Sequence, residues 1–180
     1  MIDPAPIAIL LGLRGSGKST LSKSLATRLD RPWLDLDHAV LARLGVDSVA
    51  EAFSQLGEPA FREAEALSLA EAVRTPIVLA LGGGTPFVVG GRELIEDAKR
   101  RGSLVIWTDA PDRVLAARIA SGSDRPPLRG DDAAGEIALL RSERQRTYRA
   151  LADLRIDTEA FPPVLAVEAI LRALQDRGIS

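Results

Sequence analysis

The stretch from Gly12 to Thr20 constrains the fold of this chain more than any other. It reads Gly-Leu-Arg-Gly-Ser-Gly-Lys-Ser-Thr and fits the pattern G-x-x-x-x-G-K-[ST]. Residues 7–11 before it are all apolar, as in a strand covered on both faces, and residues 18–29 after it repeat apolar side chains at helical spacing. A strand, a glycine-rich turn and a helix N-terminus in this order predict an anion site, because backbone N–H groups and the helix dipole attract phosphate.

Within this loop we expect Lys18 to reach the β- and γ-phosphates of a nucleoside triphosphate, and the Ser19 hydroxyl to hold Mg²⁺. Glycine lets the backbone N–H groups of the loop turn toward the phosphates. The predicted phosphate-binding residues are Arg14, Gly15, Ser16, Gly17, Lys18, Ser19 and Thr20. The loop therefore indicates a triphosphate site, and the use made of the γ-phosphate has to be inferred from the rest of the chain.

Length and composition exclude several classes of protein. The chain has 180 residues, 46% of them hydrophobic, which suits one domain over residues 1–180 with a normal core. A net charge of −2 argues against a nucleic-acid partner, and no apolar run reaches the length of about 18 residues that a membrane span needs. The absence of cysteine excludes disulfides and thiolate metal sites. Asp3 stands where a secretory signal would carry basic residues, so we expect a cytoplasmic enzyme. We also expect a monomer.

Strand and helix patterns alternate along the chain, which predicts an α/β fold with a parallel sheet. Further strands are expected at 33–37, 77–81, 104–107 and 155–157. Further helices are expected at 48–56, 59–73, 92–101, 111–122, 133–151 and 163–174. Residues 121–132 are polar and rich in glycine and proline, and we interpret them as a mobile lid.

Two predicted strands end in residues that suit chemistry, at the sheet edge where parallel α/β proteins bind ligands. Asp35 and Asp37 are two apart on the predicted second strand and would point the same way. One carboxylate could act on Mg²⁺ through water, and the other could accept a hydrogen bond from an incoming hydroxyl and serve as a base. The third strand runs into Gly82-Gly83-Gly84, which would let the backbone approach a small polar substrate.

Two predicted helices each carry charged or polar residues on one face. These are Glu58, Arg62 and Glu65 on the first helix, and Arg141, Arg144 and Tyr148 on the second. Each set is either a solvated surface network or part of a site where guanidinium groups bind a substrate carboxylate in a bidentate way. Arg125, in the lid, is either exposed to solvent or stabilises a phosphoryl group in transfer.

In order and spacing, these motifs resemble those of the shikimate kinases, a family of the P-loop kinase superfamily, over nearly the whole chain. The matching motifs are Gly12 to Thr20, Asp35-Leu36-Asp37, Gly57-Glu58, Phe61-Arg62 with Glu65, Leu81-Gly82-Gly83-Gly84, Arg125-Pro126, and Arg144 with Tyr148. Phe61-Arg62 together with the triple glycine separates this family from its relatives. The resemblance implies a three-layer fold with a five-stranded parallel sheet, a lid at about 121–132 and a substrate-binding helical segment at about 37–65. It also implies that the chain transfers the γ-phosphoryl group of ATP to the 3-hydroxyl of shikimate, a step towards chorismate and the aromatic amino acids.

The same resemblance implies roles for individual residues. Arg62 and Arg144 would grip the shikimate carboxylate, and Asp37 would hold the hydroxyls and accept the proton. Ser19 and Asp35 would serve Mg²⁺, directly or through water. The other implied contacts are Glu65, Gly82, Gly83 and Gly84 with shikimate, Lys18 and Arg125 with the transferring phosphoryl group, and Arg118 with adenine.

Two positions depart from the family pattern. After Asp157-Thr158, where relatives often have an arginine near adenine, this chain reads Glu159-Ala160-Phe161. Either Phe161 packs on the base or adenine recognition is looser. In the lid, Pro127 stands where leucine is commoner, and we expect a stiffer lid with the same chemistry.

Two other functions remain open from the sequence. A gluconate or nucleoside monophosphate kinase would share the phosphate loop but lack the triple glycine after the third strand. A kinase-like domain that senses a ligand without turnover would keep the binding residues.

Overall fold

The computed structural model describes residues 5–121 and 133–179, and its centre is a five-stranded parallel sheet in the order β2-β3-β1-β4-β5. The strands are β1 (Ala8–Leu11), β2 (Trp33–Asp35), β3 (Val78–Ala80), β4 (Leu104–Asp109) and β5 (Leu154–Asp157). All four pairs of neighbouring strands are parallel, so the carboxyl ends of the strands meet at one edge. The predicted α/β fold is confirmed.

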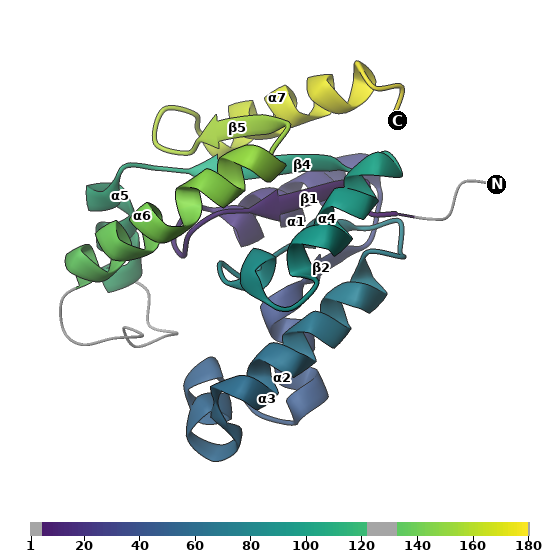
Figure 1. Cartoon of the computed structure of the whole chain (residues 1–180). Coiled ribbons are helices and arrows are strands. Elements are labelled where there is room, and N and C mark those ends of the chain that lie inside the picture. Colours follow the sequence, from purple (N-terminus) through teal and green to yellow (C-terminus); the bar gives the residue numbers. More distant parts are fainter. Residues whose placement is uncertain (1–4, 122–132, 180) are drawn as a thin grey trace.

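Helices flank this sheet on both faces (Figure 1). They are α1 (Lys18–Leu29), α2 (Leu36–Leu44), α3 (Val49–Ala72), α4 (Gly91–Arg100), α5 (Asp112–Ser121), α6 (Ala133–Leu151) and α7 (Pro163–Gln175), with a short 3₁₀ turn, η1 (Thr85–Phe87). None of these helices is long and apolar enough to cross a bilayer. Apart from Ser121, which ends α5, the predicted lid lies outside the described residues, and Arg125 and Pro127 with it.

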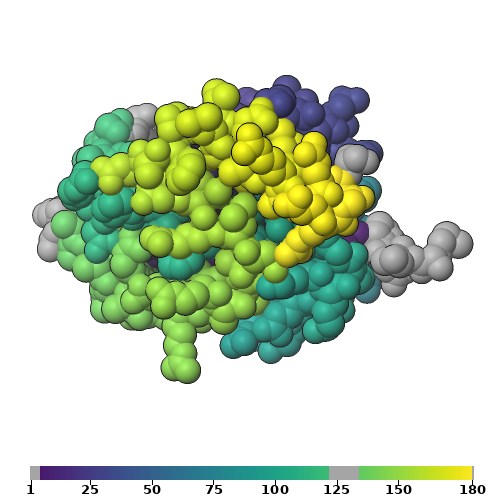
Figure 2. All heavy atoms as spheres, turned by 90° about the horizontal axis from the view of Figure 1, so that it is seen from above, coloured from purple at the N-terminus to yellow at the C-terminus, as the bar shows by residue number. Residues whose placement is uncertain are grey.

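Alternation of side chains along the strands explains the three layers. In β1, Ala8 and Leu10 pack in a cluster with apolar residues of α1 and α7. Ile9 and Leu11 point to the opposite face and pack in a second cluster with α3, α4 and α6. The segment from β5 to α7 spreads over the end of the molecule seen from above in Figure 2. Both faces of the sheet are therefore buried, as the continuous apolar strands predict.

A break inside α3 shapes the segment that precedes the triple glycine. Ser48 caps the helix by accepting a hydrogen bond from the Glu51 N–H at 3.1 Å. Gly57 then departs from helical geometry, with φ 82° and ψ 158°, and the helix resumes around Pro59. The break between the helices predicted at 48–56 and 59–73 is confirmed.

The predicted strand at 33–37 is wrong at its end. It stops at Asp35, and Asp37 lies in the first turn of α2. The reason is helix capping: Asp35 is the N-cap, and its Oδ1 accepts a 3.1 Å hydrogen bond from the Asp37 N–H. The two carboxylates therefore do not share one face of a strand, and their relation is that of a cap to the turn it caps.

Candidate active site

The phosphate loop joins β1 to α1 in a conformation that depends on glycine. Gly12 has φ 148°, and a Cβ built on it would overlap the carbonyl oxygen of Thr108 on β4. Gly17, with φ 89°, is the left-handed N-cap of α1 and offers no side chain to the helix end. Beneath the loop, buried Ser16 Oγ and Thr108 Oγ1 lie 2.8 Å apart and share a hydrogen bond. The N–H groups of a helix end and a turned loop suit the expected anion site.

Lys18 lies across the loop to which it belongs. Its Nζ donates to the carbonyl oxygens of Gly12 at 3.1 Å and Leu13 at 2.9 Å. The positive charge is thus held over the backbone of this loop.

Ser19 and Asp35 bring two hard oxygen donors together beside the loop. The Ser19 hydroxyl donates to Asp35 Oδ2 at 2.6 Å, and both side chains can be reached by solvent. No group of three or more His, Cys, Asp or Glu side chains able to hold a metal occurs in residues 5–121 or 133–179. A hydroxyl and one carboxylate fit Mg²⁺, which keeps several waters and takes phosphate oxygens as further ligands.

A cavity of about 450 Å³ opens next to the phosphate loop. Arg118 lines it, and its Nη1 donates to Gly15 O at 3.2 Å and to Thr158 Oγ1 at 2.8 Å. Phe161, two residues before α7, and Pro163, the first residue of α7, form part of the same lining. The remaining lining residues are Gly15, Gly17, Lys18, Ser19, Thr20, Leu21 and Thr158. Its volume and its aromatic and guanidinium walls suit a nucleotide base and ribose.

The triple glycine, at the end of β3, is surrounded by charged side chains. A Cβ built on Gly82 would overlap Asp37 Oδ1 and lie 3.1 Å from Glu65 Oε1. A Cβ on Gly84 would lie 2.6 Å from Arg62 Nη1, and one on Gly83 would lie 3.4 Å from both Arg144 Nη1 and Gly12 O. Glycine is required here because two carboxylates and two guanidinium groups approach the backbone, which also borders the phosphate loop.

Arg62 is held by two carboxylates on its own helix. Its Nη1 donates to Glu65 Oε2 at 2.7 Å, and its Nε and Nη2 donate to Glu58 Oε1 at 3.2 and 3.1 Å. Glu65 is only 1% exposed. Burial disfavours the charged guanidinium, but hydrogen bonds and charges of Glu65 and Glu58 outweigh burial and raise the pKa of Arg62 above its usual value.

Tyr148, one turn after Arg144 on α6, contacts the triple glycine directly. Its buried Oη donates to Gly83 O at 2.6 Å. Burial raises the pKa of Tyr148 to about 12, against the opposing effect of the Arg144 charge. Tyr148 is therefore a neutral donor at physiological pH.

The structure brings most of the predicted substrate-contacting residues together at the end of β3: Asp37, Arg62, Glu65, Gly82, Gly83, Gly84 and Arg144. Arg141 does not join them. It turns to the end of β4, where its Nη1 donates to buried Asp109 at 2.9 Å and its Nε pairs with Asp112. Their positions on one face of α6 could not distinguish Arg141 from Arg144 in sequence. The two differ in their partners: Arg141 lies beside Asp109 and Asp112, and Arg144 lies beside Gly83.

The sequence analysis named Tyr148 only as a member of one helix face with Arg144, and it did not consider Thr85 or Phe87; all three contact site residues. Tyr148 had a signal, since it follows Arg144 by four residues on a helix. Thr85 and Phe87 stand immediately after the triple glycine, but their contacts with Glu65 and Arg144 depend on how α3 and α6 pack.

Comparison with known proteins gives one consistent family. A family model described as shikimate kinase matches residues 14–175. The shikimate kinase of Corynebacterium glutamicum is 36% identical over 170 residues, covering 94% of this chain and 97% of that protein. The solved structure of shikimate kinase from Acinetobacter baumannii in complex with shikimate has a TM-score of 0.83 at 26% identity, covering 99% of this chain and 97% of the other. A gluconokinase from Sinorhizobium meliloti, at 17% identity, TM-score 0.52 and coverage of 97% and 93%, shares the fold alone.

Proposed function

Because this chain belongs to the shikimate kinase family, we propose that it transfers the γ-phosphoryl group of ATP to the 3-hydroxyl of shikimate with the residues around its triple glycine. One observation carries the assignment of the acceptor site. The guanidinium groups of Arg62 and Arg144 lie against Gly84 and Gly83, and the carboxylate of Asp37 lies against Gly82. Buried Glu65, the second carboxylate here, is bonded to Arg62. Two guanidinium groups and the carboxylate of Asp37 beside a phosphate loop suit an acceptor that has a carboxylate and hydroxyls.

The carboxylate of shikimate would bind Arg62 and Arg144. Each planar guanidinium can donate two parallel hydrogen bonds to a carboxylate, which fixes the orientation of the ring as well as holding its charge. Glu65 keeps the Arg62 guanidinium in place from the buried side, through the 2.7 Å bond to Nη1.

Asp37 would accept a hydrogen bond from the 3-hydroxyl and take its proton as the phosphoryl group is transferred. The transition state of phosphoryl transfer is loose in most analyses, so positioning the hydroxyl contributes more than strong deprotonation. The Gly83 N–H would add a donor to a substrate oxygen, since the Tyr148 bond to Gly83 O holds this residue in place.

The nucleotide would lie in the phosphate loop and the adjoining cavity. Lys18 would bind the β- and γ-phosphates, and Ser19 and Asp35 would hold Mg²⁺, with the carboxylate acting directly or through water. When bound, Mg²⁺ supplies charge that neutralises the phosphate oxygens. Arg118 and Phe161 would contact the base. We also propose that Arg125 stabilises the phosphoryl group from the lid.

The chain would work as a cytoplasmic monomer. Every residue assigned to either substrate comes from the same chain, so the site needs no partner subunit, and ATP is abundant in the cytoplasm. Light scattering after size exclusion would give the mass of one chain, 19.2 kDa, and twice this mass would contradict the proposal.

A coupled assay with ATP, Mg²⁺ and a panel of acceptors tests the function. We expect turnover with shikimate and background rates with gluconate and nucleoside monophosphates. Phosphorylation of gluconate or a nucleotide, with shikimate inert, would overturn the assignment. Calorimetry that shows shikimate or ATP binding without turnover would instead identify a ligand sensor.

A further inference from the structure

The turn η1 follows the triple glycine without a break and is bonded to it. The Thr85 N–H donates to Gly82 O at 3.2 Å, and the Phe87 N–H donates to Gly84 O at 2.9 Å. Pro86, between them, restricts the backbone further. Side chains of this turn are therefore placed relative to the glycines with little freedom.

Thr85 reaches one of the two arginines through Glu65. Its hydroxyl donates to Glu65 Oε1 at 2.6 Å, and Glu65 Oε2 accepts from Arg62 Nη1 at 2.7 Å. Thr85 is 0% exposed and Glu65 is 1% exposed, so water does not replace the threonine donor. Each carboxylate oxygen of Glu65 is thus bonded to a different partner, so the carboxylate cannot rotate freely. The orientation of the Arg62 guanidinium, which is bonded to one of these oxygens, is fixed with it.

Phe87 reaches the other arginine directly. The Arg144 Cζ lies 5.6 Å from the centroid of the Phe87 ring, within the range of a cation–π contact. The same ring packs edge-on against Tyr148, with centroids 6.1 Å apart and planes at 67°. Phe87 is nevertheless 46% exposed, so burial of its ring does not account for its position.

We propose that η1 is the positioning element of the carboxylate site: Thr85, through Glu65, orients Arg62, and Phe87 orients Arg144. Neither residue needs to touch shikimate. Their effect is to hold two long side chains in the binding geometry before the substrate arrives, which lowers the conformational entropy that binding would otherwise cost. This inference rests on the proposed function, since it takes the substrate to be a carboxylate.

Paired substitutions distinguish the loss of a hydrogen bond or ring contact from the effect of a changed side-chain size. Thr85→Val removes the donor and keeps the size, and Thr85→Ser keeps the donor. We expect the KM for shikimate to rise about tenfold in Thr85→Val, with recovery in Thr85→Ser. Phe87→Leu should raise the KM for shikimate about threefold, with recovery in Phe87→Tyr. The effect is smaller because a cation–π contact at a partly exposed site is weaker than the buried hydrogen bond of Thr85. In all four variants the KM for ATP should stay unchanged.

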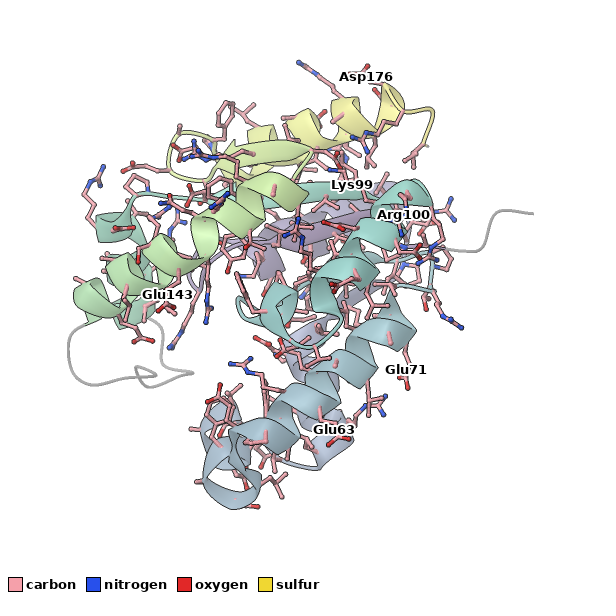
Figure 3. All side chains as sticks on the ribbon, in the orientation of Figure 1. Glu63, Glu71, Lys99, Arg100, Glu143 and Asp176 are labelled. Atoms are coloured by element: carbon pink, nitrogen blue, oxygen red, sulfur yellow. The ribbon has the colours of Figure 1, made fainter. Side chains whose placement is uncertain are left out.

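Two exposed glutamates provide matched controls. Glu63 on α3 and Glu143 on α6 are the sequence neighbours of Arg62 and Arg144, and Figure 3 labels both on the outside of their helices. Glu63→Gln and Glu143→Gln should leave both KM values unchanged. An equal rise in these controls would show a general charge effect and overturn the proposal.

A second substrate tests whether the carboxylate is the group concerned. The analogue has a primary alcohol in place of the carboxylate. Thr85→Val and Phe87→Leu should have the same KM for this analogue as the unsubstituted enzyme. If both variants lose the same factor with the analogue as with shikimate, the turn has only a structural role and the proposal is wrong.

A measurement without substrate keeps this inference distinct from the proposed function. In ¹⁵N NMR spectra of the free protein, Thr85→Val should speed solvent exchange of the Arg62 guanidinium N–H groups, and Phe87→Leu those of Arg144. Unchanged exchange in both variants would overturn the positioning role. Shikimate inert with the unsubstituted enzyme would overturn the proposed function, whatever the NMR result.

Discussion

Tyr148 donates a 2.6 Å hydrogen bond to the carbonyl oxygen of Gly83, and this bond joins α6 to the end of β3. The two residues are 65 positions apart in the chain. The bond has consequences for both substrate binding and stability, because the same helix carries Arg144 and the same glycine carries the Gly83 N–H.

Tyr148→Phe should weaken shikimate binding without much change in ATP binding. The substitution removes the donor to Gly83 O, a part-buried carbonyl, at a cost of about 1 kcal/mol of folding free energy. We expect the KM for shikimate to rise and the midpoint of denaturant unfolding to fall. An unchanged shikimate KM, measured in the steady state at saturating ATP, would limit the bond to a structural role.

The raised pKa of Tyr148 predicts a particular alkaline dependence of stability. Burial raises this pKa to about 12 in the folded protein, against about 10 for an unfolded tyrosine. The folded protein favours the neutral phenol and disfavours the phenolate. The contribution of neutral Tyr148 to the free energy of unfolding is therefore fully present below about pH 10 and is lost as the pH rises towards about 12. Denaturant unfolding at a series of pH values should show a steeper loss in this window for the unsubstituted protein than for Tyr148→Phe. Identical slopes would contradict burial of the phenol.

Asp37→Asn should abolish most turnover while leaving ATP affinity nearly intact. The amide cannot accept the proton of the hydroxyl, and loss of a positioned base typically lowers the rate by a factor of about 10²–10⁴. Stopped assays give the rate, and titration calorimetry with ATP gives the affinity. A large loss of nucleotide binding would show that Asp37 serves the phosphate site.

Arg144→Ala should act mainly on the KM for shikimate, with a rise of about tenfold to a hundredfold for the loss of a charged hydrogen-bond donor to a carboxylate. Arg146→Ala, an exposed arginine on the same helix, is the matched control and should have no effect. Were both variants to behave alike, Arg144 would have no place in the acceptor site.

Phe161→Ala should raise the KM for ATP by about tenfold, because stacking of an aromatic ring on a base contributes about 1–3 kcal/mol. The KM for shikimate should not change. Val164, 69% exposed on the next turn, offers the control Val164→Ala. Equal ATP KM values for Phe161→Ala and the unsubstituted enzyme would mean that Phe161 lines the cavity without contacting the base.

Local patterns were sufficient for most of the fold. The phosphate loop, the Ser48 cap and the break at Gly57 are all encoded within a few residues, because turn, cap and helix geometry depend on near neighbours. The apolar strands likewise predicted a sheet buried on both faces. Local patterns misplaced the end of β2, where capping by Asp35 competes with strand extension, and they missed the helix α2 that this cap begins. They also ended β4 at residue 107, two residues before Asp109.

Contacts between distant segments decided which charged residues gather at the triple glycine. Arg141 and Arg144 lie on one helix and read alike in sequence, yet Arg141 pairs with Asp109 of β4 while Arg144 meets Gly83 and Phe87. Nothing near Thr85 in the chain indicates Glu65 as its partner, since that bond exists only because α3 packs against η1. Spacing along a helix specifies a face, and the packing of that face against the sheet specifies the partner of each side chain on it.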